Sequence, residues 1–474
     1  MSRVREDNDI SGRFPCDATG LVSGYESGAF SPVDAITGCL QHIESKDQEI
    51  RAFVCLNNSA MEEARASTAR YSAGRPLGPL DGVPIAIKDN LAVRGLPATW
   101  GCSHYAEYVP ETDELPVARL RAGGLIVIGK TNVPEFTLEG YTGNRLFGVT
   151  RNPWDVRLTP GGSSGGSVAA IAARFVPVAI GTDGGGSIRR PAAYTGLVGL
   201  KPSIGAIARG GGLPQVLLDF EVIAPVARSV RDLSLLFEIL AGPDRRDHRS
   251  RRFANSKQSR PSPQGRVLLV ERLGEKPVDS EILQSLNTAA DGLAALGLRI
   301  ERDSLPFDTE PVDAFWSIVA EVGLARLFDS EPRIRETASA KYVEMAKRGA
   351  AISAETFLAG LQKVWGFRDR VGEAFEHLDM IMTPACAAMP WPAADPWPGT
   401  IDGHVVGPRG HAVYTGWVNV CGHPAISVPG PPAPSGLPIG FQLVGDIGTD
   451  KHLIDVAQLY ESAYPWSQRR PLQF

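Results

Sequence analysis

The sequence predicts an α/β fold around one large sheet, and three observations support this prediction. The chain has 474 residues, of which 43% are hydrophobic and 21% charged, so it can bury a large core. Short apolar runs lie between glycines, as is typical of strands buried on both faces; they cover 83–87, 125–128 and 176–180. Stretches with helical character separate them, at 116–122, 167–174 and 229–241. This alternation of strands and helices is typical of an α/β sheet.

Before this alternation begins, residues 28–75 are predicted to be helical. Ser31 is a favourable N-cap, Pro32 is tolerated in a first helical turn, and Asp34 occupies the third helical position. Apolar residues then follow at helical spacing. We therefore expect N-terminal helices ahead of the sheet.

The second half of the chain begins after a polar, basic connector at 244–266. One arginine-rich loop in an acidic chain is usually a solvated connector rather than a nucleic-acid site. The periodicity beyond it predicts further strands and helices. The predicted strands are 267–270, 298–301, 380–382, 425–428 and 439–444, and the predicted helical regions are 280–296, 312–378 and 450–463.

Charge and cysteine content narrow the class of protein. The net charge of −5 offers no cationic surplus for binding a polyanion, so we expect no nucleic-acid partner. We find neither a membrane-spanning apolar run nor a signal-peptide pattern at the start, and we expect no membrane partner. The six cysteines are widely spaced and are expected to be reduced thiols. The sequence thus predicts a cytoplasmic globular protein.

The densest motif is a pair of glycine-serine segments, GGSSGGS at 161–167 and GTDGGGSIR at 181–189. A phosphate loop is disfavoured because neither GxxxxGK[ST] nor a complete dinucleotide fingerprint is present. A flexible linker usually lacks the strand and helices that flank these segments. A Ser-His-Asp hydrolase is disfavoured because no GxSxG elbow occurs in the required setting and no histidine is close in sequence.

A reactive serine without a histidine needs another proton acceptor, and a buried lysine can serve if burial keeps it neutral. Lys88 directly follows the apolar run 83–87, at a strand end where α/β sites gather. Lys130 is placed equivalently after the next run. A lysine at a strand end also commonly reaches out to water. The residues alone leave these alternatives open.

The two glycine-serine segments, together with GLVGLKP, which ends at Pro202, resemble the amidase signature family. The similarity extends to segments 82–89, 151–154, 227–232 and 422–427, in the same order. It implies a single domain with a mixed, twisted sheet covered by helices on both faces. The regions it implies are an amidase signature domain over 1–474, N-terminal helices at 28–75, a catalytic core at 80–243, the connector at 244–266, a helix-rich substrate-side region at 267–378 and a C-terminal sheet and helix at 379–474.

The resemblance implies a Ser-cisSer-Lys triad. Ser187 would be the nucleophile, Ser163 the bridging serine after a cis peptide bond, and Lys88 the base. It implies no cofactor and no metal.

The neighbouring residues would support this triad. Backbone N–H groups expected to form the oxyanion hole belong to Gly184, Gly185, Gly186 and Ser187. Ser164, Asp183 and Arg189 would hold the loops, the last two as a buried ion pair. Family members commonly carry a side chain at position 184, so glycine there is expected to widen the space beside the oxyanion hole.

The substrate pocket is predicted from weaker signals. Tyr141, Asn144, Arg209 and Gly210 are candidate substrate-binding residues, and the glycine-rich loop 205–220 is a candidate lid. Aromatic residues in the second half suggest an apolar pocket, with ordinary core as the alternative; they are Trp316, Phe328, Trp365, Phe367, Trp391, Trp397, Tyr414 and Trp417.

These observations favour a stand-alone hydrolase, monomeric or homodimeric, that cleaves the C–N bond of linear amides through an acyl-enzyme. Aryl or bulky hydrophobic amides are the favoured substrates, with carbamates (urethanase activity) and esters as further candidates. The alternative is the amidase (glutaminase) subunit of a tRNA-dependent amidotransferase. A catalytically dead scaffold is disfavoured by the complete triad.

Overall fold

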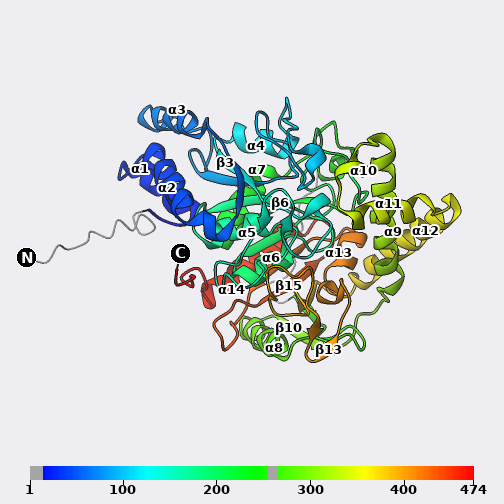
Figure 1. Cartoon of the computed structure of the whole chain (residues 1–474). Helices are drawn as coiled ribbons and strands as arrows, with labels where there is room; N and C mark the ends of the chain where they lie inside the picture. The colour runs from blue at the N-terminus through cyan, green and yellow to red at the C-terminus, as the bar shows by residue number, and fades with distance from the viewer. Residues whose placement is uncertain (1–13, 255–264, 474) are drawn as a thin grey trace, which may run out of the picture.

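The fold of residues 14–254 and 265–473, the ranges described by the computed structural model, is built on one eleven-stranded mixed sheet (Figure 1). β2 runs parallel to both of its neighbours, β3 and β6, while β6 pairs with β8 antiparallel. The prediction of a large mixed α/β sheet is confirmed. In sheet order the strands are β1 (Phe53–Leu56), β3 (Ile126–Thr131), β2 (Pro84–Lys88), β6 (Val178–Asp183), β8 (Val222–Ala227), β7 (Val198–Lys201), β14 (Ala425–Pro429), β15 (Gly440–Gly445), β11 (Met380–Pro384), β9 (Arg266–Leu269) and β10 (Arg299–Arg302).

Helices cover both faces of this sheet because successive side chains of each strand point to opposite sides. Ile85 and Ile87 of β2 join one apolar core, whereas Ala86 between them joins another. On the Ile85 side lie α4 (Leu115–Ala122), α7 (Val230–Leu240), α8 (Ser280–Ala295) and α14 (Asp450–Ala463). On the Ala86 side lie α2 (Pro32–Ile50), α3 (Ala60–Ser72), α5 (Gly165–Ala172) and α6 (Arg189–Thr195).

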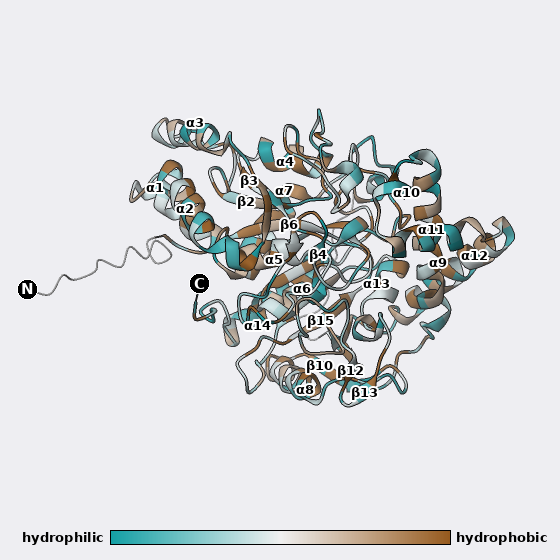
Figure 2. Ribbon diagram, in the orientation of Figure 1, coloured by the Kyte–Doolittle hydropathy of each residue, from teal (hydrophilic) through white to brown (hydrophobic). Residues whose placement is uncertain are grey.

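A third apolar core lies among the helices at one end of the molecule, on the right in Figure 1. These helices are α9 (Glu310–Ser330), α10 (Ile334–Thr337), α11 (Ala340–Ala350), α12 (Ala354–Ala374) and α13 (Gly416–Cys421). Figure 2 shows apolar colour along the central strands and much polar colour on peripheral helices such as α3 and α12. The remaining elements are α1 (Ala18–Ser27), the hairpins β4 (Gly143–Asn144) with β5 (Gly148–Val149) and β12 (Thr400–Ile401) with β13 (His404–Val405), and short 3-10 helices at Ser103–Tyr105, Glu135–Thr137, His248–Phe253 and Gly410–Ala412.

The N-terminal segment departs in part from its prediction. α2 begins as expected, with the Ser31 and Asp34 side chains forming a reciprocal capping box. The helix ends at Arg51, which adopts a left-handed conformation with φ of 58°, and the Asp47 carboxylate accepts the next two backbone N–H groups. The chain then forms β1, which pairs with β3. The prediction that residues 28–75 are helical is therefore wrong at this strand.

Residues 255–264 of the predicted connector lie outside the described residues, while 248–253 form a 3-10 helix. In the described part of the chain, no helix combines the length and the apolar character that crossing a bilayer requires.

Candidate active site

Lys88 is the last residue of β2, and its side chain is fully buried. Its Nζ lies 2.9 Å from Ser163 Oγ, 2.9 Å from Thr182 Oγ1 and 3.3 Å from the Thr182 carbonyl oxygen. Burial lowers the pKa of Lys88 to about 7, although the negative charges of Glu221 and Asp183 oppose this shift. A substantial fraction of this amine is therefore neutral near pH 7, when it can accept a proton.

Lys130 occupies the equivalent position on β3, but its ammonium has different partners. It donates to the carbonyl oxygens of Asp89 and Pro97, both at 2.9 Å, and lies 3.8 Å from the Asp89 carboxylate. Lys130 thus fixes the segment that follows β2. Of the two lysines that the sequence left open, Lys88 is the one in contact with a serine of the glycine-rich segments.

Hydrogen bonds link the two glycine-serine segments, 161–167 and 181–189. Ser163 follows a cis peptide bond after Gly162 and is buried. The Ser164 amide donates to the Ser187 carbonyl at 3.2 Å, and the Ser164 hydroxyl donates to the Thr182 carbonyl at 3.2 Å. Ser187 lines a large cavity. The fold therefore brings Lys88, Ser163 and the Ser187 segment together at the ends of neighbouring strands.

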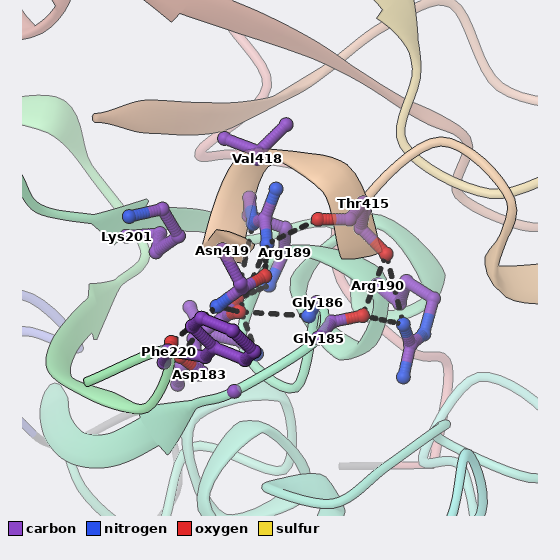
Figure 3. A network of polar contacts seen from close by, with 12 residues as sticks. Asp183, Gly185, Gly186, Arg189, Arg190, Lys201, Phe220, Thr415, Val418 and Asn419 are labelled. Carbon is purple, nitrogen blue, oxygen red and sulfur yellow. Dashed lines mark hydrogen bonds and ion pairs between the residues drawn. The ribbon is translucent and has the colours of Figure 1, made fainter. Parts of the chain in front are cut away.

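The loop before Ser187 is organised by Asp183, as Figure 3 shows. Its carboxylate forms a buried ion pair with Arg189, with a shortest N–O distance of 2.9 Å. It also accepts from the Asn419 side chain at 3.0 Å and from the Gly186 amide at 2.7 Å. Burial alone would raise the pKa of Asp183, but the Arg189 guanidinium and these donors hold it well below its usual range.

The contacts of the three glycines bear on the predicted oxyanion hole. The Gly186 N–H is occupied by Asp183, so the prediction that it donates to a substrate oxygen conflicts with this geometry. The Gly184 carbonyl accepts from Trp316 Nε1 at 2.7 Å. The Gly185 carbonyl accepts from the Thr415 hydroxyl at 2.8 Å and from Arg190, both visible in Figure 3. Gly184, Gly185 and Ser187 all line the cavity.

The cavity has a volume of about 860 Å³ and mixes aromatic with charged side chains. Of the eight aromatic residues noted in the sequence, Trp316 and Trp397 line it. Trp365 is 52% exposed, and the other five are buried in the apolar cores. Most of these rings therefore fill the core between helices, as the alternative interpretation expected, and only Trp316 and Trp397 contribute to the wall of the cavity.

Only one of the four predicted substrate-binding residues lines the cavity. Tyr141 lines the cavity. Asn144 instead closes its own turn, accepting from the Leu146 and Phe147 amides. The Arg209 guanidinium is buried between Glu114 and Glu221, at 2.8 and 2.6 Å, and the Gly210 carbonyl accepts from the Leu115 amide. Asn144, Arg209 and Gly210 are not among the residues lining the cavity, so this geometry does not support their predicted contact with substrate.

The loop 205–220 fills the space that glycine at position 184 was expected to open. A Cβ atom built on Gly184 would lie 2.7 Å from a methyl carbon of Leu217, which itself lines the cavity. The absent side chain therefore makes room for Leu217 rather than for a larger substrate.

Sequence reasoning missed four residues of the site: Thr182, Arg190, Arg409 and His411. Thr182 and Arg190 lie within the recognised motif, next to Asp183 and Arg189. Arg409 and His411 come from a distant segment, and no local pattern marks them as neighbours of Ser187. Within 14–254 and 265–473, no group of three His, Cys, Asp or Glu side chains is arranged to hold a metal ion.

The chain belongs to the amidase family, whose profile matches residues 34–454. Among curated proteins it is similar to a glutamyl-tRNA(Gln) amidotransferase subunit from Alkaliphilus metalliredigens, with 33% identity over 92% of this chain and 94% of that one. The corresponding subunit of Symbiobacterium thermophilum is 34% identical, over 94% of this chain and 96% of that one.

Solved structures of the same family superpose over almost the whole chain. A bacterial aryl acylamidase of the amidase signature family matches with a TM-score of 0.87 and 29% identity, covering 96% of this chain and 97% of that one. A 6-aminohexanoate cyclic dimer hydrolase with bound substrate matches with a TM-score of 0.85 and 29% identity, over 98% and 99%. The family and the fold predicted from the sequence are confirmed.

Two sequence-based expectations are corrected by these relatives. The favoured function, a stand-alone hydrolase of aryl or bulky amides, is overturned because full-length curated relatives are named amidotransferase subunits. The expectation of a monomer or homodimer without a nucleic-acid partner is overturned by the same names, which are those of one subunit of an enzyme of glutamyl-tRNA(Gln). Net charge did not anticipate these names because it reports only the sum of charges over the whole chain.

Proposed function

We propose that this chain is the amidase subunit of an amidotransferase and that it hydrolyses the side-chain amide of glutamine. The observation that carries the proposal is the contact of 2.9 Å between the buried Lys88 amine and Ser163 Oγ, beside a cavity that exposes Ser187. The near full-length similarity to subunits of glutamyl-tRNA(Gln) amidotransferase supports the choice of glutamine over an aryl amide. The charged lining of the cavity supports the same choice, because glutamine is zwitterionic.

The reaction begins with a proton relay. Neutral Lys88 accepts the Ser163 hydroxyl proton while Ser163 accepts that of Ser187, and Ser187 Oγ forms a bond to the amide carbon of glutamine. The relay then reverses, and Ser163 gives a proton to the departing nitrogen. The C–N bond breaks, and ammonia leaves the glutamyl ester of Ser187. Water attacks this ester by the same relay and releases glutamate.

The negative oxygen of the tetrahedral intermediate is stabilised by backbone N–H groups. Because the Gly186 amide is engaged by Asp183, the donors in this proposal are the amides of Gly184, Gly185 and Ser187. Removing one such donor in other enzymes costs about 2.7–4 kcal/mol in the transition state. Thr182 is a positioning residue, since its hydroxyl and carbonyl hold the Lys88 amine beside Ser163.

Purified full-length chain is expected to release ammonia from glutamine with a higher kcat/KM than it shows for 4-nitroacetanilide. The physical reason is that an uncharged aryl amide gives the cationic groups of the cavity wall, Arg190 and Arg409, no anionic partner. Ammonia release and nitroaniline absorbance measure the two reactions on one preparation. Faster anilide cleavage, with the Ser187→Ala variant as the blank for both, would refute glutamine as the substrate.

The pH profile of kcat/KM tests the role of Lys88. Because burial lowers the pKa of Lys88 to about 7, the neutral amine is lost as the pH falls through 7. The rate should therefore be on a plateau at higher pH and fall about tenfold per pH unit below 7. Lys88→Arg keeps the positive charge but cannot supply a neutral base, and it should be inactive across the range. A flat wild-type profile from pH 5 to 9 would argue against Lys88 as the base.

A further inference from the structure

The carboxylates that line the cavity are all neutralised by cationic partners. Four glutamates belong to this lining, and each forms an ion pair. The pairs are Glu139 with Lys341 at 2.7 Å, Glu221 with Arg209 at 2.6 Å, Glu321 with Arg348 at 2.6 Å, and Glu344 with Lys347 at 2.6 Å. The acidic side of the cavity therefore carries little uncompensated charge.

Two guanidinium groups that line the same cavity, those of Arg190 and Arg409, take no part in these ion pairs. Within the described ranges neither forms an ion pair with a carboxylate. Arg190 is engaged by neutral oxygens, namely the Thr415 hydroxyl at 2.9 Å and the Gly185 and Gly162 carbonyls. The Arg409 guanidinium has no hydrogen-bond acceptor among the described residues. Its central carbon lies 3.9 Å from the centroid of the Trp316 ring.

Arg409 remains a cation at neutral pH. Burial and the neighbouring Arg190 lower its pKa to about 10, although the charges of Asp313 and Glu139 oppose this shift, and 10 is still well above 7. Stacking on an aromatic face suits a guanidinium and leaves its edge N–H groups directed sideways, where they can form the paired hydrogen bonds that a carboxylate accepts. The cavity thus has a preorganised donor group that lacks an acceptor.

His411 adds a second unused polar group to the same wall. It is buried and lines the cavity, and neither of its ring nitrogens has a hydrogen-bond partner within the described part of the chain. Burial and the positive charges of Arg190 and Arg409 hold the pKa of His411 well below its usual value. The ring is therefore neutral and offers one N–H donor, and buried donors normally find an acceptor.

Trp316 connects this wall to the reactive loop. Its Nε1 donates to the Gly184 carbonyl at 2.7 Å, and a Cβ atom on Gly185 would lie 3.3 Å from its ring. The same indole carries Arg409 on its face. The indole of Trp316 thus lies between the Arg409 guanidinium and the loop that carries Ser187. Because this side chain is rigid, it fixes the distance between that cation and the loop.

We infer that Arg409, stacked on Trp316 and assisted by the His411 N–H, binds a carboxylate of the substrate. The site would therefore select amides that carry an anionic group over neutral amides. The identification of that group as the α-carboxylate of glutamine rests on the proposed function, whereas the selection for an anion does not.

Matched amides test this selection on the full-length chain. Glutamine, glutaramate and butyramide share a primary amide on a short chain, but glutaramate lacks the amino group and butyramide lacks both charged groups. Wild type is expected to prefer the first two over butyramide at least tenfold in kcat/KM. Arg409→Gln should raise KM for glutamine and glutaramate tenfold or more and leave butyramide within threefold, so the preference disappears.

Two further variants separate carboxylate binding from a general disturbance of the cavity. Arg409→Lys keeps the charge and should restore part of the preference for glutaramate. Arg348→Gln removes a lining cation that is already paired with Glu321 and is 58% exposed, and it should keep the wild-type preference. Equal loss of preference in Arg348→Gln and Arg409→Gln would overturn the inference, and so would an unchanged preference in Arg409→Gln.

Binding of the product gives a readout that needs no turnover. Titration calorimetry with L-glutamate should show binding to wild type and at least tenfold weaker binding to Arg409→Gln. Absence of glutamate binding to wild type, or equal binding to both proteins, would overturn the subsite. If no amide is hydrolysed but glutamate binding depends on Arg409, the proposed function fails and the carboxylate subsite stands. If butyramide is hydrolysed as well as glutaramate, the amidase chemistry stands and the subsite fails.

Discussion

Ser187→Ala should lower ammonia release from glutamine by about 10⁴-fold or more, the scale seen when a serine nucleophile is removed elsewhere. The hydroxyl is the atom proposed to bond to the amide carbon, and no neighbouring group replaces it. The fold should be unaffected, because the substitution removes one small polar atom from a side chain at the cavity wall. The thermal midpoint of the variant should therefore stay close to that of wild type.

Labelling with a fluorophosphonate probe gives an independent measurement of the same residue. Wild type should be labelled at Ser187, and Ser187→Ala should not be labelled. Ser164→Ala is the matched control, since its hydroxyl contacts the Thr182 carbonyl rather than the cavity, and it should be labelled and lose no more than about tenfold in activity. Retained labelling or turnover in Ser187→Ala would place the nucleophile elsewhere.

Asp183→Ala should destabilise the protein by about 3–5 kcal/mol, the usual cost of removing one partner of a buried ion pair. Arg189 would keep a buried charge without its carboxylate, and the Gly186 and Ile188 amides would lose their acceptor. Urea denaturation measures this loss. Because the same carboxylate holds the loop that carries Ser187, any folded fraction should also have a reduced kcat.

The control for this prediction is Asp155→Ala. Asp155 pairs at 2.6 Å with Arg157, whose side chain is 85% exposed, so the loss should be small. Asp183→Asn retains one acceptor oxygen and should fall between the two. Equal unfolding midpoints for Asp183→Ala and wild type would show that the ion pair does not hold this loop.

Local sequence patterns predicted the elements around the site well. Buried strands have continuous apolar runs, so the bounds of β2, β3 and β6 were located within three residues, and the Ser31 cap located the start of α2. β1 was missed because its four residues follow a helix directly. The turn between them depends on Arg51 in a left-handed conformation, which its residue type does not favour.

The choice of base and the shape of the pocket needed the structure. Lys88 and Lys130 have the same local environment in sequence, and only their acceptors distinguish them: Ser163 and Thr182 for the first, backbone carbonyls for the second. The pocket wall is formed by residues more than a hundred positions apart, such as Gly184 and Trp316. Composition alone could not tell which aromatic rings face a substrate and which fill a core.

Lys88 and Thr182 are 94 residues apart in the chain, yet they lie on adjacent parallel strands, β2 and β6. Their spacing is therefore set by the backbone ladder, and the length of the polypeptide between them has no influence on it. Insertions or deletions between these strands that also spare β3 and the Ser163 segment should leave the Lys88 amine beside Thr182 and Ser163. Residues of the same stretch that line the cavity, such as Tyr141, can therefore change while the contacts of Lys88 are kept.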